Sequence, residues 1–329
     1  MEHVAIVRWY RLGVGSLGVE SADRELADRF ETIYGDSATD GPGDGPRVIC
    51  RVELPADGTV RVSFDDPEPL DEARFIETVF PDRGYLSRVD DGGRLVVRLP
   101  GSTDEVTLSG GALTAPAATR WQPLVANLAV SRVLRLQRSM IFFHAASLRI
   151  GGRGLLACGP KRSGKTTLTL GLAARGHGLL GDEIAALDTG SRELLPFRRS
   201  VAMREGPSST GASALLAGTG GVSERFPDGE LRTRLVVRRI SPELPPARTP
   251  LTTVVILRSI VPATQVRAVP VGPAMLGALT PLAASIWDRS PALVAMQLLR
   301  TFAGTQVFEI DSGPPDEVAD RIETLMEER

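Results

Sequence analysis

The sequence predicts an α/β fold of two domains, in which a small α+β domain precedes a larger domain built around a phosphate-binding loop (P-loop). The apolar run GLLAC (154–158), the glycine-rich GPKRSGKTT (159–167) and the helical TTLTLGLAARG (166–176) follow one another as strand, loop and helix. The segments 141–150 and 153–159, joined by two glycines, predict a β-hairpin that enters this loop. A length of 329 residues is enough for two domains. We expect these domains at 1–116 and 117–329, with a mixed sheet and helices in the second.

The loop matches the pattern of a glycine, four free positions and Gly-Lys-Ser/Thr. Gly159 permits a sharp turn out of the strand, and Gly164 lets the backbone approach a phosphate without a Cβ clash. The loop amides and the positive end of the following helix then attract the anion. Lys165 is expected to reach the β and γ phosphates, and the Thr166 hydroxyl to bind Mg²⁺. The residues predicted to bind the nucleotide are Gly159, Lys161, Arg162, Ser163, Gly164, Lys165, Thr166 and Thr167.

Lysine usage gives an independent indication of the same site. The chain has only two lysines, Lys161 and Lys165, and the other 36 of its 38 basic residues are arginines. A chain that otherwise avoids lysine keeps both inside the loop, where a compact ammonium group suits a phosphate.

Composition restricts the partners. With 38 basic and 40 acidic residues the formal net charge is −2, so no general basic field indicates a nucleic-acid partner. We expect a nucleotide together with a peptide, protein or small hydroxyl-bearing acceptor, and leave homo-oligomerisation open.

The cysteines and the N-terminal residues predict a reducing cytoplasm. Cys50 and Cys158 are far apart and show no metal-ligand spacing, and MEHVAIVRWYRLG lacks a basic-then-apolar signal. No segment reaches about 18 uncharged apolar residues, so we expect no membrane span.

The first domain offers no catalytic constellation. Five carboxylates, Asp65, Asp66, Glu68, Asp71 and Glu72, lack ordered ligand spacing and are interpreted as a solvated face, with docking of a substrate or partner as the alternative. The predicted elements are strands over 4–10, 47–54, 59–64 and 94–100, a loop over 36–46 and a helix over 22–34 capped by Ser21.

Acidic residues follow the strand after the loop helix. Asp182 and Glu183 end a short strand within 177–188, where carboxylates can hold Mg²⁺ or accept a hydroxyl proton from the acceptor. An exposed turn is the structural alternative. His144, in an apolar strand expected near the loop strand, is either a core residue or an imidazole presented to Asp182.

The segment 142–187, FFHAASLRIGGRGLLACGPKRSGKTTLTLGLAARGHGLLGDEIAAL, resembles the catalytic core of HPr kinase/phosphorylase. It is still more similar to the HPr kinase-related kinases, which include enzymes that phosphorylate serine in ribosomally made peptides such as lasso-peptide precursors. The shared features are His144, the hairpin, the P-loop, Arg-Gly-His at 175–177 and the acidic pair. The resemblance covers roughly residues 121 to 200, is weak beyond them, and is only architectural before them.

This resemblance implies an ATP- and Mg²⁺-dependent serine-type kinase. It places Lys165 and Thr166 on the nucleotide and metal, Asp182 as the catalytic acid/base, and His144 beside that carboxylate. The family normally has a second aspartate as metal ligand, where this chain has Glu183. A counterpart of the segment associated with phosphorolysis is not evident, so the resemblance favours kinase activity over the reverse reaction.

Downstream arginines are candidates for stabilising a transferred phosphoryl group, because guanidinium groups pair well with its oxygens. The candidates are Arg198, Arg199, Arg232 and Arg234, and a loop over 206–230 is expected to close over the substrate. The remaining predicted elements are a helix over 117–139 with an apolar stripe at Trp121, Leu124, Val125 and Leu128, strands over 252–257, 265–269 and 305–310, and helices over 275–287, over 291–302 and from Pro315.

Three alternatives stay open from the sequence. The acceptor can be a free amino acid, the domain can be a nucleotide-binding regulatory or scaffold module that transfers nothing, or it can be an NTPase with water as acceptor.

Overall fold

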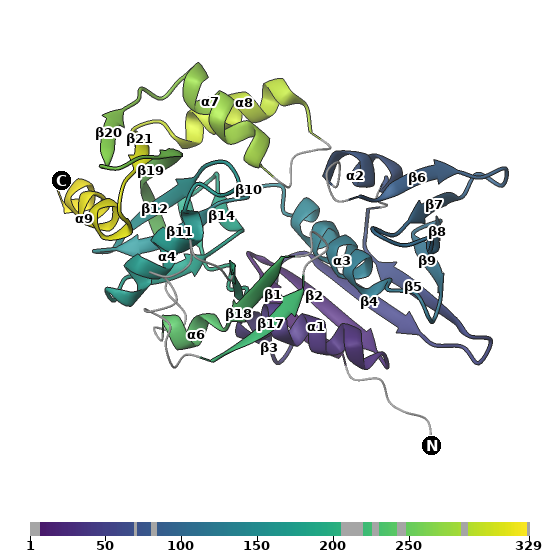
Figure 1. Cartoon of the computed structure of the whole chain (residues 1–329). Helices are drawn as coiled ribbons and strands as arrows, with labels where there is room; N and C mark the ends of the chain where they lie inside the picture. Colours follow the sequence, from purple (N-terminus) through teal and green to yellow (C-terminus); the bar gives the residue numbers. More distant parts are fainter. Residues whose placement is uncertain are drawn as a thin grey trace. The chain divides into compact units, whose positions relative to one another are not determined.

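A computed structural model describes residues 7–68, 71–79, 84–204, 220–225, 230–241, 248–283 and 289–327. The chain forms two compact units, Met1–Gln137 and Arg138–Arg329 (Figure 1). The boundary lies after the helix α3 (Gln122–Leu136), whereas the sequence placed it before that helix. The reason is packing, because α3 lies against strands β2 and β4 of the first unit and buries Leu124, Val125 and Leu128 there.

The first unit is one nine-stranded sheet with helices α1 and α3 against it (Figure 1). The strand order is β3-β1-β2-β4-β5-β9-β8-β7-β6, and among these described strands only the pair β2–β4 is parallel. The predicted strands are confirmed as β1, β4, β5 and β7, although residues 4–6 lie outside the described residues. The elements are β1 (Val7–Leu12), β2 (Gly15–Ser21), α1 (Arg24–Tyr34), η1 (Gly35–Ser37), β3 (Ala38–Thr39), β4 (Arg47–Glu53), β5 (Thr59–Asp65), α2 (Glu72–Val79), β6 (Leu86–Val89), β7 (Leu95–Arg98), β8 (Glu105–Ser109) and β9 (Ala112–Pro116).

The cap of α1 differs from the prediction. Asp23 is the N-cap, and its Oδ1 accepts a hydrogen bond of 2.7 Å from the backbone N–H of Leu26. Ser21 instead accepts a hydrogen bond from the N–H of Asp23. A carboxylate three residues before an unpaired amide is an equally good cap and also suits the positive end of the helix.

The interpretation of the acidic cluster as a solvated face is wrong for two of its members. Arg132 of α3 is fully buried, and its guanidinium pairs with Asp66 at 2.8 Å and Glu72 at 2.6 Å, both carboxylates being nearly buried. Burial raises the pKa of Glu72, and Arg132 opposes that rise. The sequence could not reveal this triad because Arg132 lies 60 or more residues away.

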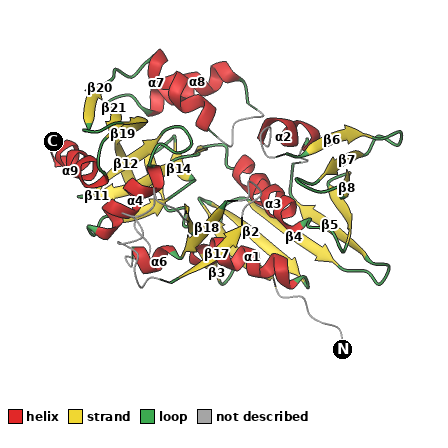
Figure 2. Ribbon diagram, in the orientation of Figure 1, coloured by secondary structure: helices red, strands yellow, loops and turns green. Residues whose placement is uncertain are grey.

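The second unit is built on three parallel strands, β12, β19 and β21, with antiparallel strands around them. A separate three-stranded sheet has the order β16-β18-β17. Figure 2 shows helices of this unit on either side of its strands. Its elements are β10 (Met140–Phe143), β11 (Ala146–Ile150), β12 (Arg153–Cys158), α4 (Lys165–Ala174), β13 (Gly178–Gly181), β14 (Ala185–Asp188), β15 (Glu193–Leu195), β16 (Val201–Arg204), β17 (Gly221–Arg225), β18 (Leu231–Leu235), α6 (Val237–Ile240), β19 (Thr249–Ile260), β20 (Gln265–Ala268), α7 (Pro273–Leu279), η3 (Thr280–Leu282), α8 (Pro291–Thr301), β21 (Gln306–Ser312) and α9 (Pro315–Glu327).

The hairpin that enters the P-loop is confirmed as β11 and β12. Its turn is formed by Gly151 and Gly152, at φ of 55° and 80°, as the favoured two-residue hairpin turn requires. The predicted single strand over 141–150 is wrong, because His144 and Ala145 divide it. The part before them, β10, pairs with β14, whereas β11 pairs with β12 and β13.

Two apolar clusters fix the layers of this unit. One joins Leu168 and Leu172 of α4 to strands β11 and β12 and to Val318 and Ile322 of α9. The apolar side of the last helix is therefore part of the unit's own core. The other cluster places α7 and α8 against β10, β14 and β19.

Some predictions lie outside the described residues. These are most of the loop over 206–230 and the end of the helix predicted over 275–287. Among the helices that the structure describes, none has the length and apolar character needed to cross a membrane.

Candidate active site

Three chemically distinct segments meet at one edge of the sheet. Strand β11 runs antiparallel to both β12 and β13, so β12 and β13 point in the same direction. The P-loop follows β12 and Asp182 follows β13, so both leave the sheet where β11 begins. His144 lies two residues before β11, at this same edge. The topology therefore brings together residues that are up to 38 positions apart, at the carboxyl ends of strands where α/β proteins usually bind ligands.

The P-loop turn depends on its first glycine. Gly159 has φ of 155°, and a Cβ there would lie 2.5 Å from the carbonyl oxygen of Leu257. Gly164, at φ of 90°, is the N-cap of α4. The helix therefore begins at Lys165, one residue before the predicted start, with its first amides directed to the loop.

Lys165 is held inside this turn. Its Nζ donates hydrogen bonds to the carbonyl oxygens of Gly159, at 2.8 Å, and Pro160, at 2.9 Å. Burial lowers the pKa of the ammonium group, while the neighbouring carboxylate of Asp182 favours the charged form. The group is thus a desolvated cation next to the loop.

Asp182 is buried, and its carboxylate meets the first turn of α4. The Thr166 hydroxyl donates to Asp182 Oδ2 at 3.2 Å. Burial raises the pKa of Asp182 to about 6, helped by the negative charge of Glu183 and opposed by Thr166, Arg199 and Lys165. A carboxyl that titrates near neutral pH can accept or release a proton under physiological conditions.

Glu183 faces arginine rather than threonine. Its carboxylate is 3.1 Å from Arg199 Nη2, and its backbone has φ of 63°. Burial alone would raise its pKa, but Arg199, Arg234, His144 and Arg232 together hold it below its usual range. The two adjacent acids therefore have opposite electrostatic characters, one protonated readily and one firmly ionised.

His144 contacts the backbone of the acidic pair rather than its carboxylates. Its ring Nδ1 is 3.1 Å from the carbonyl oxygen of Glu183, and its backbone N–H donates a hydrogen bond to the carbonyl oxygen of Leu282. The ring is exposed, yet the surrounding protein removes enough water to lower its pKa. The imidazole thus contacts Glu183, the residue after Asp182. If Nδ1 carries the proton, it donates a hydrogen bond to the Glu183 carbonyl oxygen.

The rest of the loop divides into inward and outward side chains. Ser163 is buried and packs behind Gly159, and Thr167 is half-buried in the first turn of α4. Lys161 and Arg162 are exposed, and Arg162, at φ of 71°, pairs with Glu230 at 2.8 Å.

The four candidate arginines have different surroundings. Arg198 is buried and donates to the carbonyl oxygen of Ser241, which indicates a structural role. Arg199 pairs with Glu183. Arg232 and Arg234 project from β18 and pair with Glu230 and Glu224.

Two further charged residues were missed by the sequence analysis. Arg204 of β16 contacts Glu230 at 2.8 Å, and Arg204 is close enough to Lys165 to disfavour its charge. Only the tertiary fold brings these positions to the loop, and nothing in their local sequence distinguishes them from surface charges.

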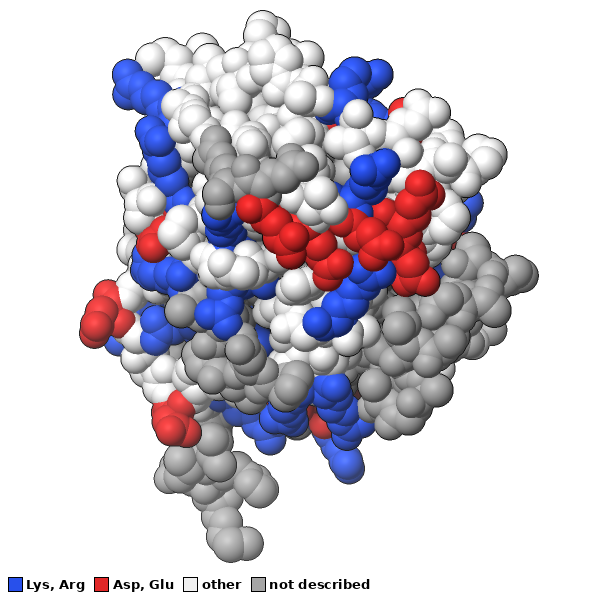
Figure 3. Space-filling view, turned by 90° about the vertical axis from the view of Figure 1, so that its left-hand side faces the viewer, with Lys and Arg blue, Asp and Glu red and all other residues white. Residues whose placement is uncertain are grey.

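The Arg-Gly-His segment has a structural role. Arg175, at the end of α4, pairs with Asp320 at 2.6 Å and Glu323 at 2.7 Å, and His177 Nε2 is 2.7 Å from Glu323. These contacts join α4 to α9, in a region where acidic and basic side chains lie side by side (Figure 3).

The oxygen donors fit Mg²⁺. The residues predicted to hold the ion, Thr166 and Glu183, offer hydroxyl and carboxylate oxygens, the ligand type that Mg²⁺ prefers, although the Glu183 carboxylate pairs with Arg199 at 3.1 Å. Among the described residues, no group of three or more acidic, histidine or cysteine side chains gathers as a metal cage. Mg²⁺ needs none, because it usually keeps several waters and takes one or two protein ligands with substrate phosphates.

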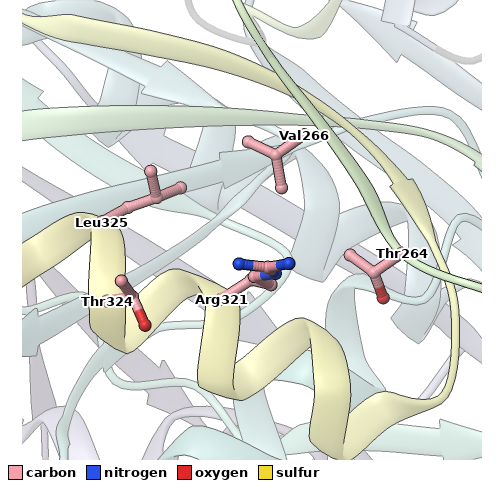
Figure 4. A pocket seen from close by; sticks show the side chains of 5 residues that line it. All are labelled: Thr264, Val266, Arg321, Thr324 and Leu325. Atoms are coloured by element: carbon pink, nitrogen blue, oxygen red, sulfur yellow. The ribbon is translucent and has the colours of Figure 1, made fainter.

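A cavity of about 240 Å³ lies elsewhere in this unit, between β20 and α9 (Figure 4). Its lining consists of Thr264, Val266, Arg321, Thr324 and Leu325. This lining contains no residue of the P-loop and no carboxylate among the residues that the structure describes. The cavity is therefore separate from the candidate active site.

The fold and the site define a mixed α/β protein in which a strand, a P-loop and a helix follow one another. No family model matches the chain, and no curated protein matches it. Among solved structures, the HPr(Ser) kinase/phosphatase from Coxiella burnetii is similar at 16% identity, over 56% of this chain and 93% of that chain, with a TM-score of 0.28. A likeness of this size assigns no activity to this chain.

Proposed function

We propose that the second unit transfers the γ-phosphoryl group of ATP to a serine-type hydroxyl on a peptide or protein, with Mg²⁺. The observation that carries this proposal is the hydrogen bond of 3.2 Å between Thr166 and Asp182. This contact sets a buried carboxyl against helix α4, which follows the P-loop, where the donor phosphates would bind.

The P-loop would hold the donor. The amides at the start of α4 and the loop present donors to the phosphates, and Lys165 would exchange the carbonyl oxygens of Gly159 and Pro160 for phosphate oxygens. A desolvated ammonium group interacts with an anion more strongly than a solvated one does. The remaining loop residues, Lys161, Arg162, Ser163 and Thr167, would surround the phosphates.

Asp182 would accept the proton of the attacking hydroxyl. A pKa of about 6 leaves the carboxyl mostly ionised at neutral pH and basic enough to take a proton. His144, held at the Glu183 carbonyl, would help to position this acidic turn. Mg²⁺ supplies neutralisation of phosphate charge, and we assign it to Thr166, with Glu183 as the second protein ligand once its carboxylate leaves Arg199.

The arginines would stabilise the charge on the transferred group. Arg199, Arg232 and Arg234 all lie close enough to Glu183 to lower its pKa, so they surround the acidic turn. Guanidinium groups bind the oxygens of a phosphoryl group in pairs of hydrogen bonds. The first unit, with its large sheet, would dock the substrate or a partner.

The test is phosphoryl transfer measured by mass spectrometry. The purified chain is incubated with Mg-ATP and serine-containing peptides, proteins or free serine, and Asp182→Asn serves as the inactive comparison. A phosphopeptide formed by the natural chain alone supports the proposal. Formation of free phosphoserine would indicate an amino-acid kinase. Steady release of phosphate without an acceptor would indicate an NTPase, and binding of nucleotide without any product would indicate a regulatory module.

A further inference from the structure

One carboxylate next to the P-loop binds three arginines. Glu230 Oε1 is 2.8 Å from Arg162 Nη2, and Glu230 Oε2 is 2.8 Å from Arg204 Nε and 3.2 Å from Arg232 Nη2. The arginines come from three places, namely the P-loop, β16 and β18. We call Arg162, Arg204 and Arg232 the arginine cage.

The pairing of the strands forces two members of the cage together. Arg204 and Arg232 are directly opposite each other in the antiparallel pair β16–β18. Like charges at opposite positions destabilise a sheet unless an anion lies between them. Glu230 supplies that anion, because its carboxylate contacts all three arginines of the cage.

The third member connects the cage to the nucleotide site. Arg162 lies between Gly159 and Gly164, inside the loop that would surround the phosphates. The sheet formed by β16 and β18 is packed next to this loop, because Val201 of β16 and Leu235 of β18 belong to the same apolar cluster as Leu168 of α4. The cage is therefore built at a fixed place beside the start of α4.

We propose that the arginine cage is a binding site for a terminal phosphate group, and that Glu230 occupies it until the phosphate arrives. A phosphate dianion carries more charge than a carboxylate and has three free oxygens, so it suits three guanidinium groups better. Glu230 then competes directly with the ligand and weakens its binding. This inference rests on the proposed function, because the phosphate is that of the bound nucleotide or of the product formed there.

Isothermal titration calorimetry with ATP, inorganic tripolyphosphate and AMP tests the cage. Glu230→Gln keeps the shape of the side chain and removes the competing charge. It should tighten binding of ATP and tripolyphosphate by about tenfold, as expected for one charge-assisted contact, and leave AMP nearly unchanged. Arg204→Gln should weaken ATP and tripolyphosphate by a similar factor.

The matched control is Glu105→Gln. Glu105 of β8 also lies between two arginines, Arg88 and Arg98, but it belongs to the first unit. This substitution removes the same charge and should leave all three affinities unchanged. Thermal melting checks that each variant is folded.

Two results would overturn the cage. One is a Glu230→Gln variant that binds ATP no more tightly than Glu105→Gln, and the other is unchanged tripolyphosphate affinity in Arg204→Gln. Lys165→Ala separates this failure from that of the proposed function. If Lys165→Ala loses ATP while the cage variants have no effect, only the cage is wrong, whereas unaffected ATP binding by Lys165→Ala removes the P-loop assignment itself.

Discussion

Thr166 Oγ1 lies 3.2 Å from Asp182 Oδ2, although Thr166 is in the first turn of helix α4 and Asp182 follows strand β13, 16 residues later. The contact exists because β12 and β13 point in the same direction on either side of β11. It joins the predicted phosphate loop to the predicted acid/base residue.

The two adjacent acids should differ in their effects on catalysis. Asp182→Asn removes the proposed proton acceptor, so we expect the maximal rate of transfer to fall by about 10² to 10⁴-fold. Glu183→Gln should mainly raise the Mg²⁺ concentration needed for half-maximal rate. Rates measured across a Mg²⁺ titration check both. If Glu183→Gln were inactive while Asp182→Asn remained active, the roles of proton acceptor and metal ligand would have to be exchanged between the two residues.

The rate should depend on pH through Asp182. Because the base acts when it is ionised and its pKa is raised to about 6, transfer should slow as the pH falls through about 6 and level off above it. A profile of kcat against pH, taken with saturating Mg-ATP, measures this. A profile flat from pH 5 to 8 would contradict the assignment.

The same raised pKa predicts that Asp182 reduces stability at neutral pH. The Asp182 carboxyl binds its proton more tightly in the folded chain than in the unfolded chain. This residue therefore favours the folded state most at low pH, and the stabilisation is lost as the pH rises through about 6. A pKa change from 3.8 to about 6 corresponds to about 3 kcal/mol. Asp182→Asn should therefore raise the free energy of unfolding by about 1–3 kcal/mol at pH 8 and far less at pH 4. Urea unfolding at both pH values measures the difference, and equal effects would be inconsistent with a buried ionised group.

Removal of Arg132 should strongly destabilise the first unit. Arg132→Met leaves Asp66 and Glu72 buried without their cation, which typically costs about 3–5 kcal/mol. Arg51→Met is the control, because Arg51 makes comparable ion pairs while partly exposed and should cost at most about 1 kcal/mol. Chemical unfolding at pH 7 compares them. Similar losses in the free energy of unfolding for both variants would show that the buried triad contributes no more to stability than an exposed ion pair.

The two P-loop glycines should differ in their tolerance of alanine. At Gly164 a methyl group meets no atom within 4 Å, so Gly164→Ala should cost only the left-handed backbone strain, about 1–2 kcal/mol. Gly159→Ala adds a clash with the Leu257 carbonyl oxygen and should cost more. The ordering of the two unfolding free energies tests whether Gly159 is fixed by β19.

Local patterns predicted the parts of the site but not their surroundings. The P-loop, the hairpin before it and the acidic strand end were all evident, since each depends on neighbouring residues such as Gly159, Gly164 and the Gly151–Gly152 turn. The pairing of Glu183 with Arg199 and the cage around Glu230 depend on strand pairing between distant segments, which no local pattern encodes. The burial of Asp66 and Glu72 was missed for the same reason, because only the tertiary fold brings Arg132 to them.

The central claim is that the second unit binds a nucleoside triphosphate through Lys165. Calorimetric titration of the full chain with Mg-ATP tests it most directly, with Lys161→Ala as a comparison from the same loop. We predict binding by the natural chain, a loss of affinity of at least about 10²-fold in Lys165→Ala, and a much smaller loss in Lys161→Ala, whose side chain is exposed. Equal affinities for the natural chain and Lys165→Ala, or no binding by the natural chain, would contradict the account.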